Sequence, residues 1–76
     1  MFVVKFYDYG ICYLTHHSDP NCPWVMRAAV KKAAQFKTEK AAERAFKEYF
    51  PTKYGHKLHQ PVKNLHNVEI IQIKED

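Results

Sequence analysis

The stretch that most constrains the fold is an amphipathic segment that begins near Thr38 and precedes Pro51. Its apolar residues recur at helical spacing and its charged residues pair four apart, which predicts one helix with a single buried stripe. Thr38 is suited to cap the start of this helix, and Pro51 is expected to end it. Such a helix needs a second layer to cover its stripe, so the rest of the chain must supply that layer. The stripe consists of Ala42, Ala45, Phe46 and Tyr49.

Strand patterns flank the helix. Residues 2–7 and 11–15 are rich in β-branched and aromatic side chains, and Asp8, Tyr9 and Gly10 between them supply a turn, which predicts a β-hairpin. Residues 68–73 read as a closing strand, and the Ala and Lys content of 25–34 permits a helical turn or two. The expected fold class is α+β, with a small, mostly antiparallel sheet, one main helix and the order ββαβ.

The chain is small and is expected to form one domain over residues 1–76. A core of this size supplies only about 3–5 kcal/mol, so an additional cross-link is worth seeking. The apolar start of the chain is broken by Lys5 and Asp8 and lacks the pattern of a signal peptide. No run reaches the roughly 18 apolar residues of a membrane span. We therefore expect a cytoplasmic protein whose thiols stay reduced and which has no membrane partner.

Two irregular segments, residues 15–25 and 55–61, contain side chains that bind metals. Zinc prefers four thiolate or imidazole donors, and a closed four-ligand site is structural. The two segments are therefore predicted to be halves of one zinc site, although the paired Cys-x-x-Cys of strong zinc motifs is absent. The alternative is that the histidines are surface residues and that Cys22 is a buried thiol. The predicted ligands are Cys22, His56, His59 and one of His16 and His17, with Asp19 as the reserve.

Positive charge is concentrated in the middle of the chain. Residues 27–63 carry ten Lys or Arg and three acids, a net +7, whereas the remainder carries −3. This asymmetry indicates an anionic partner, either nucleic acid or an acidic protein surface, and the alternative is a solvated helix face. The candidate partner-binding residues are Lys31, Lys32, Lys40, Arg44 and Lys47.

Aromatic side chains beside this basic segment support the nucleic-acid alternative. Tyr7, Tyr9 and Tyr13 offer faces on which bases stack in single-strand binders. The competing explanation is that they are half-buried core residues of a short sheet. No RNA-recognition consensus, zinc-finger spacing or helix-turn-helix pattern accompanies them.

Catalytic patterns are weak. The chain has no glycine-rich phosphate loop and no paired carboxylates in an apolar setting. A nucleophilic pair formed by Cys22 and a neighbouring histidine is the only catalytic arrangement it offers. We expect a protein that is not an enzyme and that takes no small-molecule substrate.

The stretch Phe36-Lys-Thr-Glu-Lys-Ala-Ala-Glu-Arg-Ala-Phe46 lies between an aromatic-rich hairpin and the closing Val68-Glu-Ile-Ile-Gln-Ile73. In this pattern the chain resembles small phage and prophage proteins, and among these it is most similar to type II anti-CRISPR proteins. The resemblance implies a host RNA-guided nuclease as partner and inhibition as function. It carries over no functional residue, because that family shares no common motif.

The charge adds an expectation about mechanism to this resemblance. A middle segment of +7 is repelled by the basic cleft in which such nucleases read the PAM. The expected contact is an acidic patch of the nuclease, where the inhibitor hinders DNA loading or activation. The alternative function is that of a basic nucleic-acid-binding accessory module.

Overall fold

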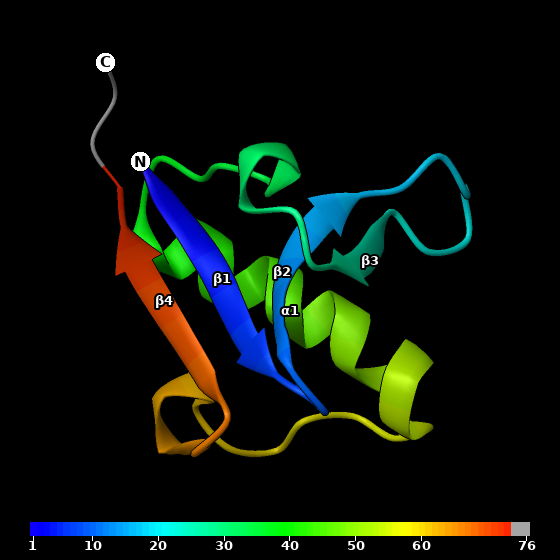
Figure 1. Ribbon diagram of the computed structural model, residues 1–76. Coiled ribbons are helices and arrows are strands. Elements are labelled where there is room, and N and C mark those ends of the chain that lie inside the picture. Colours follow the sequence, from blue (N-terminus) through cyan, green and yellow to red (C-terminus); the bar gives the residue numbers. More distant parts are fainter. Residues whose placement is uncertain (74–76) are drawn as a thin grey trace.

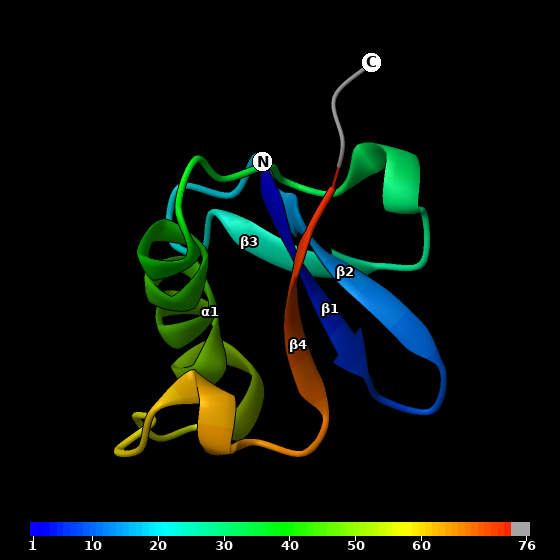
Figure 2. The same cartoon turned by 90° about the vertical axis from the view of Figure 1, so that its left-hand side faces the viewer.

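Four strands form one antiparallel sheet in the order β3-β2-β1-β4, and the helix α1 packs on one face of it (Figures 1 and 2). The computed structural model describes residues 1–73. The predicted α+β class is confirmed, but the order is βββαβ because a third strand precedes the helix. The elements are β1 (Phe2–Tyr7), β2 (Ile11–His16), β3 (Trp24–Arg27), α1 (Glu39–Tyr54), β4 (Val68–Gln72) and the 3-10 turns η1 (Val30–Lys32) and η2 (Val62–Asn64).

The predicted hairpin is present. Strands β1 and β2 pair from Tyr7 opposite Ile11 onwards, and three residues close the turn between them. Within this turn Tyr9 has a φ of 56° and Gly10 a φ of 151°, and the Asp8 amide donates to the Gly10 carbonyl at 2.9 Å. Gly10 suits its position because a residue without a Cβ adopts positive φ at little cost.

Strand β3 differs from the sequence expectation of helical structure after Val25. Residues 24–27 pair antiparallel with β2, with Trp24 opposite His16 and Arg27 opposite Tyr13. Bulky and β-branched side chains fit a pleated surface, and β2 offers a free row of backbone groups on that side. The helical tendency of this segment is realised only in η1, a single 3-10 turn.

The segment 33–36 carries the chain from one face of the sheet to the other. Phe36 exchanges both backbone hydrogen bonds with Phe2, at 2.7 and 2.8 Å, and the Ala34 amide donates to the Leu14 carbonyl at 2.9 Å. The segment therefore fills the space between the diverging ends of β1 and β2. As a result η1 lies on the opposite side of the sheet from α1 (Figure 2).

Helix α1 begins as predicted and ends later than predicted. The Thr38 hydroxyl accepts a hydrogen bond from the Ala41 amide at 3.1 Å, which is the expected N-cap. The prediction that Pro51 ends the helix is wrong, because α1 continues to Tyr54 and is capped by Gly55 at φ 79°. Contacts beyond the proline hold this last turn: Lys53 pairs with Asp8, and the Tyr54 and Phe50 rings lie 4.4 Å apart.

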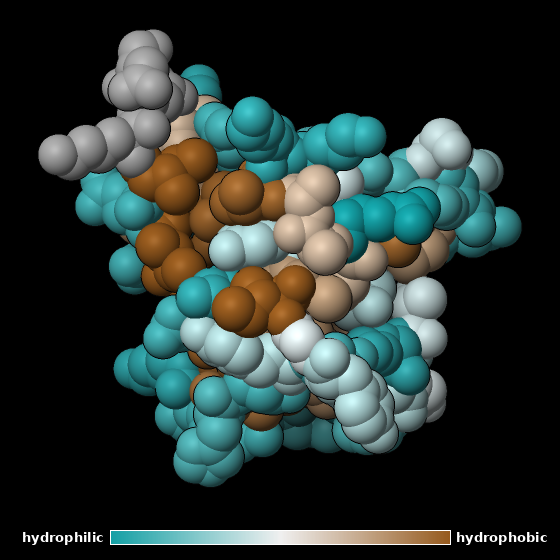
Figure 3. Space-filling model, in the orientation of Figure 1, coloured by the Kyte–Doolittle hydropathy of each residue, from teal (hydrophilic) through white to brown (hydrophobic). Residues whose placement is uncertain are grey.

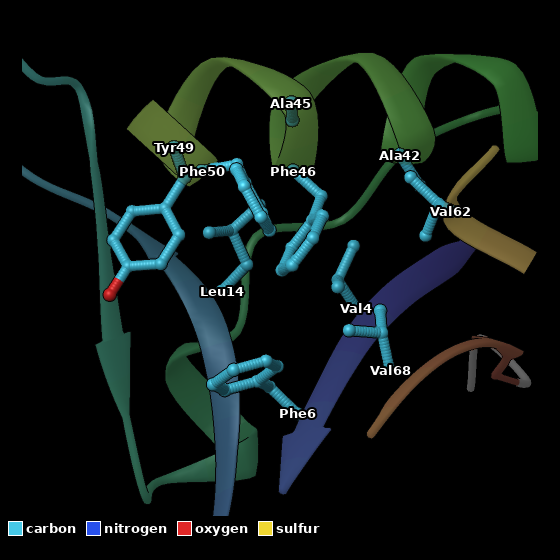
Figure 4. Packing of buried hydrophobic residues seen from close by; sticks show 10 residues of the cluster. All are labelled: Val4, Phe6, Leu14, Ala42, Ala45, Phe46, Tyr49, Phe50, Val62 and Val68. Carbon is cyan, nitrogen blue, oxygen red and sulfur yellow. The ribbon is translucent and has the colours of Figure 1, made fainter. Parts of the chain in front are cut away.

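The core lies between α1 and the face of the sheet that α1 covers (Figure 4). The predicted helix stripe is buried, and the Phe46 ring packs against the Phe6 ring with centroids 5.8 Å apart. Burying side chains of this size contributes about 1.5–3 kcal/mol each. The cluster consists of Val4, Phe6, Leu14, Ala42, Ala45, Phe46, Tyr49, Phe50, Val62 and Val68.

Candidate functional site

The first half of the predicted zinc site is the loop between β2 and β3. The Cys22 thiol is half-buried and donates to the Trp24 carbonyl at 3.2 Å. His17 accepts a hydrogen bond on Nδ1 from the Asp19 amide at 3.2 Å. His16 lies against the Trp24 ring with centroids 4.9 Å apart. Each of these side chains has a partner in the β2–β3 loop or in strand β3.

The second half is the segment after α1. His56 and His59 line one shallow hollow together with Phe50 and Leu58. The His56 ring packs edge-on against the Phe50 ring, with centroids 5.4 Å apart, and its Nδ1 lies 3.1 Å from the Lys57 carbonyl. The structure therefore places this histidine pair at the same hollow.

The two halves lie apart. The β2–β3 loop and the segment 55–61 occupy different levels of the molecule in both views (Figures 1 and 2). Within residues 1–73, no group of three or more His, Cys, Asp or Glu side chains is placed to hold a metal ion. A zinc ion shared by both segments requires them to come together, and the zinc site stays a prediction.

Metal content of the untagged protein, measured by native mass spectrometry with elemental analysis, tests this zinc prediction. The expected result is one zinc per chain, whose removal by chelation lowers the melting temperature by several degrees. A metal-free protein whose melting temperature does not change on chelation would show that the histidines are ordinary surface residues and not zinc ligands. Cys22→Ser and His59→Ala are the matched variants, because each removes a ligand from a different half.

The five predicted partner-binding cations divide into two groups. Lys40, Arg44 and Lys47 lie one turn apart along α1 and, with Glu43, line a shallow hollow on its solvent side. All three cations are exposed and point away from the buried stripe. Across residues 1–73 the one ion pair is that of Lys53 with Asp8, so these cations have no ion-pair partner there. We call Lys40, Arg44 and Lys47 the α1 cationic face.

Lys31 and Lys32 form the second group. They lie in η1, which is on the opposite side of the sheet from α1 (Figure 2). The chain passes through the sheet at residues 33–36, so residues close in sequence to the helix end up on another face. The five cations are therefore two separate patches.

A further surface is the face of the sheet that α1 leaves uncovered. Alternate residues of β1 and β2, Val4, Phe6 and Leu14, point into the core, so Lys5, Tyr7 and Tyr13 point the other way. Arg27 is on the same side, opposite Tyr13 in register. We call Lys5, Tyr7, Tyr13 and Arg27 the outer tyrosine face.

Figure 3 views this side of the sheet. Hydrophobic side chains gather over β1 and β4, with hydrophilic ones around them. Tyr7 is 41% and Ile11 48% exposed, although both lie within strands. A hydrogen bond with Tyr7 raises the pKa of Lys5 above its usual 10.5. The sequence offers two interpretations of these tyrosines; Tyr13 is half-buried and Tyr7 is exposed, and neither belongs to the core cluster under α1.

Comparisons with protein-family models, with curated proteins and with solved structures found no match. Within the described chain, no helix is both long and apolar enough to cross a bilayer. The surfaces of this molecule are therefore the features that bear on its function.

Proposed function

We propose that this protein acts by binding an acidic surface of a partner protein through the α1 cationic face. The observation that carries the proposal is the alignment of Lys40, Arg44 and Lys47, exposed and without an ion-pair partner in residues 1–73. Three cations one turn apart on a rigid helix form a preorganised surface for carboxylates. Electrostatic complementarity of this kind speeds association and selects the partner.

The composition of α1 favours a protein over a polyphosphate as the partner of this face. Glu43 lies among the three cations, and Glu39 and Glu48 lie close by on the same helix. Glu48 also accepts a hydrogen bond from the Trp24 indole at 2.9 Å. A protein whose surface is acidic overall can place carboxylates against the three cations and a few cations of its own against the glutamates, whereas the uniform charge of a polyphosphate is repelled by each glutamate.

The partner we propose is a host RNA-guided nuclease of type II, the class that the sequence resemblance implies. Contact with an acidic patch of such a nuclease hinders loading of target DNA or the conformational change that licenses cleavage. The protein is thus a phage-type inhibitor, and the basic cleft that reads the PAM is not its site. The second candidate function, nucleic-acid binding, draws its support from the other side of the sheet.

A DNA-cleavage assay with a guide-loaded type II nuclease tests the proposal. The protein is expected to inhibit cleavage, and the combined change Lys40→Glu, Arg44→Glu and Lys47→Glu is expected to abolish inhibition and co-purification with the nuclease. Lys31→Glu with Lys32→Glu is the matched control, because it reverses charge on the opposite side of the sheet. Circular dichroism checks that each variant is folded.

Two results would overturn the proposal. One is that the wild-type protein neither binds nor inhibits the nuclease. The other is that the η1 variant loses inhibition as strongly as the α1 variant, which would mean that overall charge, and not the α1 cationic face, decides binding.

A further inference from the structure

One row of side chains crosses all four strands on the outer side of the sheet. Tyr13 lies opposite Arg27 on β3 and opposite Lys5 on β1, and Lys5 lies opposite Glu69 on β4. The next row towards the hairpin turn holds Tyr7 opposite Ile11. Lys5 and Tyr13 are half-buried, whereas Arg27 and Glu69 are exposed. The row is therefore accessible from solvent, with two cations and one acid.

Each tyrosine of this surface has a cation beside it. The Lys5 ammonium lies 5.1 Å from the centroid of the Tyr7 ring. Arg27 is the cross-strand neighbour of Tyr13. Tyr7 and Tyr13 are diagonal neighbours on adjacent strands, a spacing of roughly 7–8 Å between Cα atoms. Two aromatic rings with two cations thus form a compact, repeated unit on a rigid sheet.

We infer that the outer tyrosine face binds single-stranded nucleic acid. Proteins that bind single strands without sequence preference stack bases on aromatic side chains and hold phosphates with nearby cations. Tyr7 and Tyr13 offer the ring faces, and Lys5 and Arg27 offer the charges. Duplex does not fit this site, because paired bases are stacked on one another and cannot stack on tyrosine.

Charge favours this occupant over a second copy of the chain. A symmetric dimer through this face brings the same patch against itself. Lys5 and Arg27 outnumber Glu69 in the row, so two copies repel each other there. A phosphodiester chain instead complements both cations. This inference concerns a different face from the α1 cationic face and does not depend on it.

Fluorescence anisotropy with a short labelled single-stranded DNA of mixed sequence tests the inference, and the matched RNA and duplex DNA serve as further probes. Tyr7→Ala and Tyr13→Ala are each expected to weaken single-strand binding about tenfold. Tyr7→Phe and Tyr13→Phe keep the ring and are expected to bind as the wild type does. Lys5→Gln and Arg27→Gln are each expected to reduce the steepness of the plot of log affinity against log salt concentration by about 0.7.

The variant in which Lys40, Arg44 and Lys47 are all changed to Glu is the matched control. It is expected to leave unchanged the dependence of affinity on salt concentration and the ranking of the tyrosine variants by affinity. A thermal melt confirms that every variant is folded. Three results would overturn the inference: no single-strand binding at low salt, equal binding of duplex and single strand, or alanine variants that bind as tightly as the wild type. Whether RNA or DNA binds more tightly identifies the single strand that the outer tyrosine face prefers, and either preference supports the inference.

Discussion

The two faces of the sheet carry side chains of similar size in different surroundings. On the inner face, Phe6 is 1% exposed and packs against Phe46 of α1. Its chain neighbour Tyr7 points to the other side and keeps 41% of its surface exposed. Both are aromatic residues of one strand, so the local sequence alone does not separate them. The difference arises because α1 packs over Phe6, whereas the other side of β1 is covered only at its far end, where Val3 is 2% exposed (Figure 2).

This contrast shows where the stability and the binding chemistry of the molecule lie. The ten residues of the core cluster come from β1, β2, β4, α1 and η2, and all are directed at the space under the helix (Figure 4). The outer tyrosine face adds little to that packing. An aromatic ring left half in solvent beside a cation is instead available to a ligand.

The largest expected effect comes from changing adjacent residues on the two faces. Phe6→Ala removes a buried ring and is expected to lower the free energy of unfolding by about 3–5 kcal/mol. Tyr7→Ala removes an exposed ring and its contact with Lys5, and is expected to cost about 0.5–1 kcal/mol. Urea denaturation followed by circular dichroism measures both, and for Phe6→Ala the fraction already unfolded without urea is part of the measurement.

The outcome of that pair decides whether the faces differ as described. A core of this size supplies only a few kcal/mol, so Phe6→Ala is expected to leave much of the protein unfolded without denaturant. Equal losses for Phe6→Ala and Tyr7→Ala would mean that the outer face is packed against something, and the binding proposal for it would fall.

The smallest expected effect concerns alkaline pH and the inner face. Burial raises the pKa of Tyr49 above its usual 10.0, so the folded protein holds the phenol proton more tightly than the unfolded chain does. A hydrogen bond to Asp8 raises the pKa of Lys53 above its usual 10.5 in the same sense. Both contributions to stability are therefore complete below pH 10 and are lost as the pH rises further.

Urea midpoints measured on either side of pH 10 test this expectation. The urea concentration at the unfolding midpoint of the wild type is expected to decrease as the pH rises above 10. The midpoint of Tyr49→Phe, which has no phenol proton, is expected to decrease less. An identical decline in both proteins would show that Tyr49 contributes nothing to the alkaline loss.

Local signals explain why most of the fold was predictable. The hairpin follows from alternation on both sides of Asp8, Tyr9 and Gly10, and the start of α1 follows from Thr38. Each feature is determined by residues a few positions apart. The buried stripe was also correct, because helical spacing decides which side of α1 faces the sheet.

The features that sequence missed depend on contacts between distant residues. Strand β3 forms because β2 offers it a partner, although the following alanines and lysines favour helix. The last turn of α1 survives Pro51 because Lys53 reaches Asp8, which lies 45 positions away in sequence. Spacing gave no indication of either contact.

The candidate sites show the same limit. Lys31 and Lys32 were grouped with Lys40, Arg44 and Lys47 because they are close in sequence, but the passage of residues 33–36 through the sheet places the two groups on opposite sides. Tyr7, Tyr9 and Tyr13 are the stacking candidates that residue type suggests, and the structure places Tyr9 in the hairpin turn, outside the outer tyrosine face. The cation neighbours of the other two, Lys5 and Arg27, became evident only from the strand register.

The most direct test that the two faces bind different partners is a titration of isotope-labelled protein with single-stranded DNA, followed by backbone amide chemical shifts. The largest changes in chemical shift are expected at Lys5, Tyr7, Tyr13 and Arg27, while the amide shifts of the α1 cationic face remain unchanged. The largest changes on Lys40, Arg44 and Lys47, or changes spread evenly over all basic residues, would contradict the assignment of different partners to the two faces.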